Sequence, residues 1–82
     1  MVKIKIMFFS SVKDELGMRE LEMSLPQDAK VADVLAHLKR DFERLAPILE
    51  RSCLAVNGEY ATAEAGLHEG DEVAVLPPVS GG

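Results

Sequence analysis

Residues 2–9 alternate between apolar and polar side chains over most of their length. This period is typical of a β-strand that buries one face, so we expect a strand here. Its buried face comprises Val2, Ile4, Ile6 and Phe8. Residues 20–25 alternate in the same way and stop at Pro26, which predicts a second strand that pairs with the first. Between the two strands, residues 10–17 predict a short helix that Ser11 caps and Gly17 ends.

The period of the apolar residues changes after residue 30. One helical stripe contains Val31, Val34, Leu35, Leu38, Phe42 and Leu45. This spacing predicts an amphipathic helix that packs on the sheet. Asp33 falls in the first turn, where the helix dipole favours an anion, and the cap is either Asp28 or a residue nearer Val31. Pro47 disfavours helical geometry at Ala46, so we expect the helix to end there.

Three short strands are predicted after this helix. Residues 53–56 are apolar and run into Asn57-Gly58, a pair that strongly favours a two-residue hairpin, with residues 59–61 as the returning strand. We expect Asn57 to serve the turn alone. Residues 62–67 form a connector with room for a helical turn, residues 68–71 have the composition of a turn, and the mainly apolar residues 72–76 predict a central strand. The order predicts an α+β fold, a mixed sheet of about five strands with one main helix across it.

The sequence after residue 76 has a composition of its own, Pro77-Pro78-Val79-Ser80-Gly81-Gly82. Proline lacks a backbone N–H, so the two prolines end the last strand and hold the following residues away from the domain. Glycine has no Cβ, so Gly81 and Gly82 fit where a larger residue would clash. We expect residues 1–76 to form the domain and residues 77–82 an extended tail that reaches roughly 20 Å. A frayed chain end is the alternative interpretation.

The composition fits one folded domain and argues against several classes of function. Of the 82 residues, 48% are hydrophobic and 28% are charged, which is typical of a folded domain. The net charge of −5 argues against nucleic-acid binding through a basic face. No apolar run is long enough for a membrane span and no signal peptide is recognised, so we expect a cytoplasmic protein. The single cysteine agrees with a reducing compartment.

The remaining chemically reactive side chains favour structural roles. Cys53 sits in an apolar strand and is expected to pack as a small hydrophobic residue. His37 and His68 have no metal-ligand spacing to a partner, so we expect surface positions and no metal site. Met7 and Phe9 fit two interpretations, because they either pack under a loop or form an exposed apolar patch for a partner.

Four segments together resemble a known family. They are Phe8-Phe9 with the short helix that follows, Val56-Asn57-Gly58, Gly70-Asp71-Glu72-Val73-Ala74, and Pro77-Pro78-Val79-Ser80-Gly81-Gly82. The chain resembles the ubiquitin-like sulfur carriers of the MoaD and ThiS group, and in particular the small subunit of molybdopterin synthase. The resemblance spans the whole chain, its most specific part is the last segment, and it implies the β-grasp fold.

The resemblance implies a function at the terminal carboxylate of Gly82. In the family, an ATP-dependent, E1-like activating enzyme adenylates this carboxylate, and a sulfur donor protein converts it into a thiocarboxylate, a covalent 1-thioglycine. The thiocarboxylate gives its sulfur to cyclic pyranopterin monophosphate inside the large subunit of molybdopterin synthase, during biosynthesis of the molybdenum cofactor. Sulfur is the better nucleophile, which is a physical reason to carry it in this form. The implied role is that of a non-catalytic sulfur-donor subunit that binds no cofactor itself.

Other uses of the same chemistry stay open. The chain could carry sulfur for thiazole, for a tungsten-using pathway or for another sulfur-containing product. A ubiquitin-like modifier that is attached to target proteins through Gly82 would share the activation step. A binding module with an incidental tail is a third reading, from a different functional class.

The same resemblance predicts where a partner binds. In a β-grasp sheet the first and last strands are parallel neighbours, so Phe9 and Leu76 should lie side by side where the tail leaves the domain. Alternation turns both side chains outward, because Phe8 and Val75 face the helix. We therefore expect partner-binding residues to include Phe9 and the tail-proximal set Leu76, Pro77, Pro78, Val79, Ser80 and Gly81.

Overall fold

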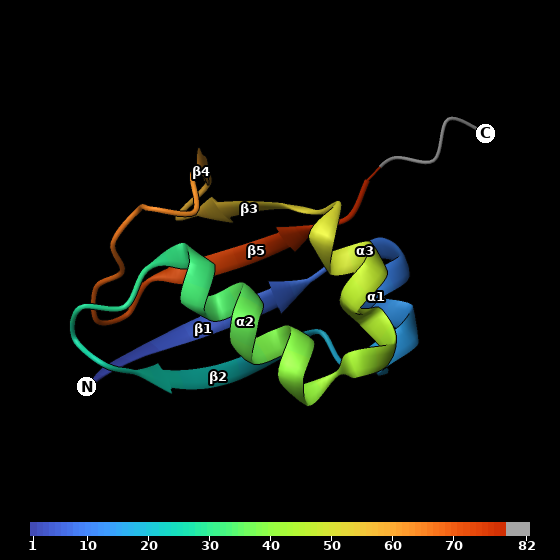
Figure 1. Cartoon of the computed structure of the whole chain (residues 1–82), viewed down its shortest axis with the longest axis horizontal. Coiled ribbons are helices and arrows are strands. Elements are labelled where there is room, and N and C mark those ends of the chain that lie inside the picture. The colour runs from blue at the N-terminus through green and yellow to red at the C-terminus, as the bar shows by residue number, and fades with distance from the viewer. Residues whose placement is uncertain (79–82) are drawn as a thin grey trace.

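The computed structural model describes residues 1–78 and shows a five-stranded sheet with helices on one face (Figure 1). The elements in chain order are β1 (Val2–Phe8), α1 (Ser10–Leu16), β2 (Glu20–Leu25), α2 (Val31–Asp41), the 3₁₀ helix η1 (Glu43–Leu45), α3 (Ala46–Glu50), β3 (Cys53–Val56), β4 (Glu59–Ala61) and β5 (Glu72–Leu76). The predicted strands are all present. The α+β class and the mixed five-stranded sheet are confirmed.

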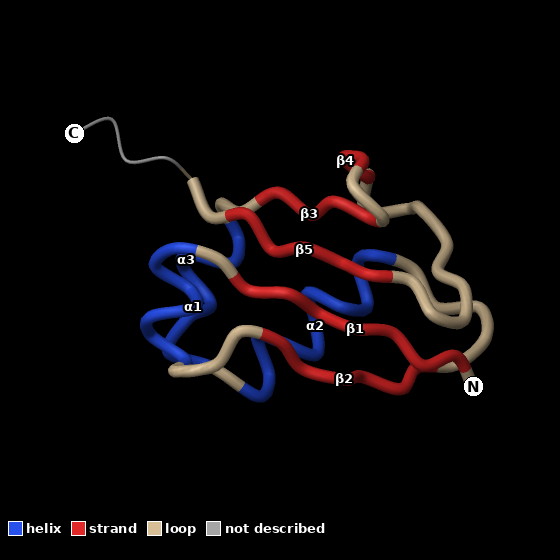
Figure 2. The backbone as a smooth tube through the Cα atoms, turned by 180° about the vertical axis from the view of Figure 1, so that it is seen from behind, coloured by secondary structure: helices blue, strands red, loops and turns tan. Residues whose placement is uncertain are grey.

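The sheet has the order β2-β1-β5-β3-β4. β1 pairs antiparallel with β2 and parallel with β5, and β5 pairs antiparallel with β3. The last strand is therefore central, as its apolar sequence predicts. Seen from behind, the strands lie in front of the helices, with α1 and α3 grouped at the end where β5 finishes (Figure 2).

The core lies between the sheet and α2. Alternation in β1 holds, since its buried face consists of Val2, Ile4, Ile6 and Phe8. The helix contributes Val31, Val34 and Leu38, and the central strand contributes Val73 and Val75. These side chains are almost completely removed from water, and their apolar area is the main source of stability in a domain of this size.

The main helix is shorter than its apolar stripe predicts. α2 ends at Asp41, because Phe42 leaves helical geometry at φ −129° and ψ 67°. We expected Pro47 to end the main helix, and this prediction is wrong. Pro47 stands in the first turn of α3, where a proline loses no hydrogen bond. Ala46 before it is helical, at φ −51° and ψ −45°. The apolar stripe continues beyond the end of α2, since Leu45 in η1 is also buried in the core.

Of the predicted helix caps, only the one at Ser11 is wrong, and the cap of α2 is a residue next to Val31, one of the two expected alternatives. Lys30 occupies the cap position of α2, and its backbone N–H donates to Oδ2 of Asp33 at 2.8 Å. Ser11 does not cap α1, because Phe9 holds that position and no side-chain cap bond is present. Gly17 does end α1, in the left-handed conformation at φ 69°, which glycine adopts without steric cost.

The predicted hairpin between β3 and β4 is confirmed, but Asn57 does more than turn the chain. Asn57 and Gly58 both have positive φ, 50° and 87°, as a two-residue hairpin turn requires. The Asn57 amide also donates to Oδ1 of Asp71 at 2.9 Å and accepts from the backbone N–H of Glu72 at 3.0 Å. This amide therefore ties the hairpin to the start of β5. Residues 62–67 form turns and an isolated bridge, Lys30 to Gly66, in place of a helical turn.

Candidate functional site

The centre of the candidate site is the end of the parallel pair β1 and β5. Phe8 is in register with Val75, and both side chains are buried against the helices. The next residues of the two strands, Phe9 and Leu76, therefore face the opposite side of the sheet. Phe9 is 39% exposed and Leu76 is partly buried. The predicted neighbourhood of these two residues is confirmed, because they line one groove together.

Strand register extends this apolar surface across the sheet. Tyr60 of β4 is opposite Ala55 of β3, which is opposite Ala74 of β5, which in turn is opposite Met7 of β1. Residues opposite one another in a sheet point to the same side, so these four form a row on the face that the helices leave uncovered. Tyr60 is 79% exposed.

A groove of about 410 Å³ crosses this face at the end of β5. Its lining consists of Phe9, Ser10, Cys53, Tyr60, Leu76, Pro77 and Pro78. We call the apolar part of this lining, Phe9, Tyr60, Leu76, Pro77 and Pro78, the tail-root surface. Sequence reasoning missed Tyr60. The sequence feature that could have identified it is a single aromatic residue at the solvent-facing position of a three-residue edge strand.

The structure corrects the expectation for Cys53. Its side chain is exposed, not packed in the core. The reason is alternation within a short strand: Leu54 is buried against the helices, so Cys53 faces the other side. Cys53 is directly opposite Leu76 and therefore lies in the groove where β5 ends.

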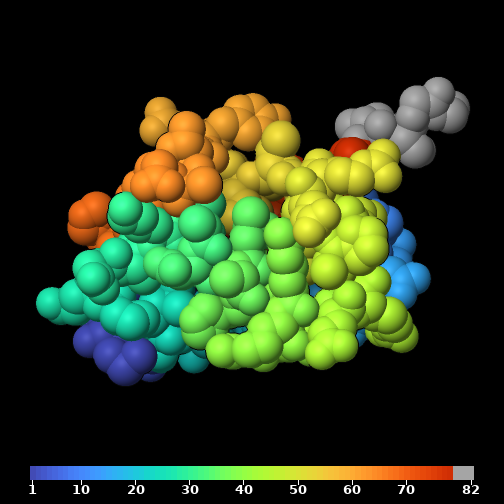
Figure 3. Space-filling model, viewed as in Figure 1, coloured from blue at the N-terminus to red at the C-terminus, as the bar shows by residue number. Residues whose placement is uncertain are grey.

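A second groove lies on the helix side of the same exit. It is lined by Ser10, Ser11, Pro47, Ile48, Arg51, Pro77 and Pro78. In the space-filling view, the last described residues emerge beside the yellow atoms near residue 50 (Figure 3). Pro77 and Pro78 thus border a groove on each side. A protein that binds the chain here therefore contacts both the open face of the sheet and the helices α1 and α3.

The structure gathers four of the predicted partner-binding residues in one place, Phe9, Leu76, Pro77 and Pro78. The other predicted positions, Val79, Ser80, Gly81 and Gly82, lie outside the described residues. His68 is exposed, and His37 is half-buried on α2 beside Arg40. Within residues 1–78, no group of three or more His, Cys, Asp or Glu side chains is arranged to hold a metal ion. None of the helices in that range has the length and apolar character required to cross a membrane.

Several curated proteins are similar to this chain over nearly its whole length. The molybdopterin synthase sulfur carrier subunit of Dictyostelium discoideum is 35% identical over 83 residues, which cover 98% of this chain and 96% of that protein. The protein of the same name from Mycobacterium tuberculosis is 33% identical over 85 residues and covers both chains completely. The resemblance inferred from the four sequence segments is thereby confirmed.

Solved structures agree with the β-grasp fold. A protein from Pyrococcus furiosus, assigned as subunit 1 of a molybdopterin converting factor, has a TM-score of 0.87 at 31% identity and covers 96% of this chain and all of its own. Small archaeal modifier protein 1 from Methanosarcina acetivorans has a TM-score of 0.85 at 27% identity, covering 100% of this chain and 98% of its own. A complex of subunits 1 and 2 of the molybdopterin converting factor from Helicobacter pylori contains the same fold, with a TM-score of 0.73 at 24% identity, covering 99% of this chain and all of the matched one.

The family follows from one further match. The ThiS family aligns with residues 6–82, which include the end of β1, the central strand β5 and every residue after it. With this match and the full-length relatives, the chain belongs to the ThiS family.

Proposed function

We propose that this chain is the sulfur carrier subunit of a molybdopterin synthase. The observation that carries the proposal is geometric: the chain leaves the central strand inside an exposed apolar surface, and the family match continues from there to Gly82. Relatives that are 31–35% identical over almost the full length are named as sulfur carrier subunits of this synthase. A carrier needs both features, an extended reactive end and a surface beside it that a partner recognises.

The proposed chemistry takes place at the carboxylate of Gly82. A carboxylate is a poor electrophile, so an E1-like activating enzyme first joins it to the α-phosphorus of ATP and releases pyrophosphate. A hydrosulfide ion that a donor protein has released then attacks the acyl carbon, AMP leaves with the electrons of the broken C–O bond, and the proton of the new S–H group is lost to water. The product is a thiocarboxylate, 1-thioglycine, whose sulfur is the nucleophile in the next transfer. Because ATP is consumed, we place this cycle in the cytoplasm.

The acceptor in this proposal is the larger synthase subunit, which binds cyclic pyranopterin monophosphate and supplies the catalytic groups. A protein of the same fold assembles with subunit 2 in the Helicobacter pylori complex, which supports a partner of this kind. Residues 77–82 would enter that partner while the tail-root surface packs against it. Apolar anchors on the folded domain suit this division, since fixing several residues of chain in a partner costs conformational entropy that the folded contact must offset.

The two prolines fit this role physically. Pro77 and Pro78 have fixed φ angles and lose less conformational freedom on binding than other residues would. Leu76, immediately before them, is held by its pairing with Cys53 on β3. The chain therefore leaves the sheet from a fixed point, and the direction in which it starts is set by β5.

Intact-mass spectrometry tests the proposal. The chain is incubated with its activating enzyme, ATP and a sulfur donor, and the same mixture without ATP is the control. We expect the mass gain that corresponds to one oxygen replaced by sulfur, and we expect transfer of that sulfur when the larger subunit and its substrate are added. An unchanged mass in the complete mixture, with a known carrier loaded in parallel, would falsify the assignment.

A second candidate function is attachment to other proteins. It is favoured by the likeness to a small archaeal modifier protein, at a TM-score of 0.85 over the whole chain. A modifier uses the same activated Gly82 but forms an amide with a lysine of its target. It would therefore appear in covalent conjugates of higher mass in cell extracts, and conjugates that persist after reduction would support this second use.

A further inference from the structure

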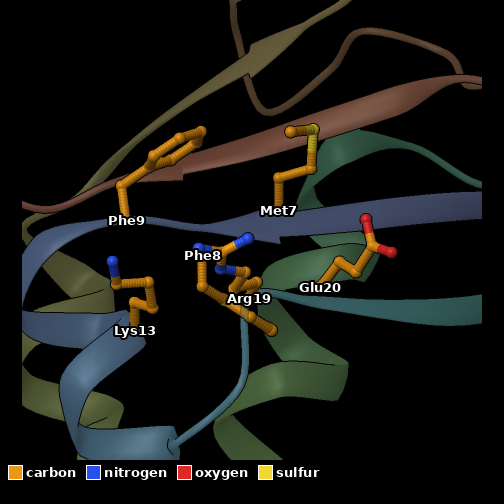
Figure 4. Close-up of a pocket in the computed structure, with 6 residues that line it drawn as sticks. All are labelled: Met7, Phe8, Phe9, Lys13, Arg19 and Glu20. Atoms are coloured by element: carbon orange, nitrogen blue, oxygen red, sulfur yellow. The ribbon is translucent and has the colours of Figure 1, made fainter.

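A third depression lies next to the tail-root surface and differs from it in charge. It is lined by Met7, Phe8, Phe9, Lys13, Arg19 and Glu20. Phe9 belongs both to this depression and to the groove of the tail-root surface, so the two are continuous. Figure 4 shows Met7 and Phe9 projecting together from one side of the β1 ribbon, with the side chains of Lys13 and Arg19 toward its other side.

The backbone fixes the positions of the two cationic residues. The N–H of Phe8 donates to the carbonyl oxygen of Arg19 at 2.8 Å, and the N–H of Lys13 donates to the carbonyl oxygen of Phe9 at 3.3 Å. The backbones of Arg19 and Lys13 are therefore bonded to two consecutive residues at the end of β1, Phe8 and Phe9. The reversal between them depends on Gly17, whose φ of 69° lets the chain turn back after α1.

Among the described residues, no carboxylate forms an ion pair with Lys13 or Arg19. Within residues 1–78, the ion pairs involve other cations, and Glu20 of this depression is itself paired with Lys5 at 3.7 Å. Arg19 is exposed and Lys13 is half-buried. A chain with a net charge of −5 thus presents two cations, to which no residue in the range 1–78 supplies an ion pair, beside the exposed Phe9.

We propose that Lys13 and Arg19 form a docking site for an acidic segment of the larger synthase subunit, contiguous with the tail-root surface. The inference rests on the proposed function and adds the charge of the contact. The segment would place carboxylates against the two cations and an apolar side chain on Met7 and Phe9. A protein segment fits better than a long polyanion such as nucleic acid, because Asp14, Glu15 and Glu20 on the adjoining elements would repel further negative charge.

Charge at the margin of an interface mainly accelerates association, whereas buried apolar contacts mainly slow dissociation. The first test therefore measures association rates with the purified larger subunit by stopped flow over a range of salt concentrations. For the double variant Lys13→Gln/Arg19→Gln we expect association about tenfold slower at low ionic strength, with most of the difference lost at high salt. The matched control is Lys3→Gln/Arg44→Gln, which changes the net charge equally but lies away from the depression.

The second test identifies the occupant. A carbodiimide joins an amine to a carboxylate in direct contact, so Lys13 should cross-link to an aspartate or glutamate of the larger subunit, located by peptide mass spectrometry. Lys13→Arg keeps the charge but removes the amine, so we expect it to lose this cross-link and retain fast association. Melting curves of all variants check that they fold.

The outcomes separate the two proposals. If the wild-type chain does not bind the larger subunit at all, the proposed function fails. If it binds, but the Lys13/Arg19 variant and its control associate equally fast, the docking site is wrong and the proposed function stands. A Lys13 cross-link to Gly82 of the same chain or to a second copy also overturns the docking site, because the occupant would not be the larger subunit.

Discussion

The two ends of the sheet are built from different interactions. Where β5 ends, the surface is apolar and open, with Phe9, Leu76 and Tyr60 around a groove. Where β5 begins, the surface is closed by polar contacts around Asp71, which is 9% exposed. Its carboxylate accepts from Asn57 Nδ2 at 2.9 Å and from the backbone N–H of His68 at 2.8 Å.

The difference shows how a small domain separates binding from stability. Polar groups that satisfy one another, as at Asp71, fix the chain but leave little to attract a partner. Exposed apolar side chains contribute less to folding, and their burial is available to stabilise a complex. We therefore expect changes at the β5 exit to affect function without unfolding, and changes at the Asp71 end to have the opposite effect.

The largest effect is expected at Gly82, the proposed reactive position. One residue appended after Gly82 moves the terminal carboxylate onto a different residue, so sulfur loading should be abolished while the melting temperature stays unchanged. Intact-mass spectrometry measures loading and circular dichroism measures melting. Normal loading of the extended chain would rule out Gly82 as the reactive position.

The next effect concerns the tail-root surface itself. Phe9→Ser and Leu76→Ser, made singly, should each weaken binding to the larger subunit by about 30-fold, the loss typical of a central apolar contact of about 2 kcal/mol. Calorimetry measures the affinity, and Ile48→Ser on the helix side of the exit tests whether the sheet side dominates. If binding survives while the domain melts earlier, Phe9 and Leu76 are core residues and the docking surface is misplaced.

At the opposite end, Asp71→Ala should lower stability and leave binding intact. The substitution removes the acceptor of two part-buried hydrogen bonds, at a cost of about 1–3 kcal/mol. In a domain of this size that lowers the melting temperature by roughly 4–8 °C for each kcal/mol. Glu69→Ala is the control, because Glu69 is exposed and accepts one bond, from the Lys3 N–H at 2.9 Å. Equal losses for the two variants would contradict the special role of Asp71.

The smallest effect on stability is expected for the exposed ion pair between Lys5 of β1 and Glu20 of β2. Lys5 and Glu20 are 3.7 Å apart, and their side chains are 43% and 57% exposed. An exposed pair of this kind contributes about 0.5 kcal/mol or less, because water and salt screen it. A double-mutant cycle with Lys5→Ala and Glu20→Ala, followed by urea unfolding, measures the coupling. A coupling above about 1 kcal/mol would show that the pair is stronger than its exposure implies.

Periodicity predicted most of the fold, because each strand has its own local signal. Alternation located β1 and β2, the Asn57-Gly58 pair located the hairpin, and an apolar run located the central strand. The end of α2 was not predictable from Pro47, since a proline is compatible with both the end of one helix and the first turn of the next. Only the geometry of Phe42 decides between these.

The candidate site was predictable along β1 and β5 but not across the other strands. The positions of Phe9 and Leu76 follow from the parallel pairing of two strands. Tyr60 and Cys53 enter the groove through register with β5, which depends on contacts far apart in the sequence. The bond from Asn57 to Asp71 spans 14 residues and has no local pattern either.

The central position of β5 has a mechanical consequence. β5 is in register with β1 at Glu72, Val73, Ala74 and Val75, and with β3 at Val73, Ala74, Val75 and Leu76. A pull on the residues that follow Leu76, directed along the strand, loads both hydrogen-bonded ladders in shear. The bonds on the two sides share that force, instead of breaking one at a time as they would if the strand were peeled from an edge. In the proposed function, a partner that pulls on the residues after Leu76 would therefore load the whole sheet, and the domain would resist that force as one unit.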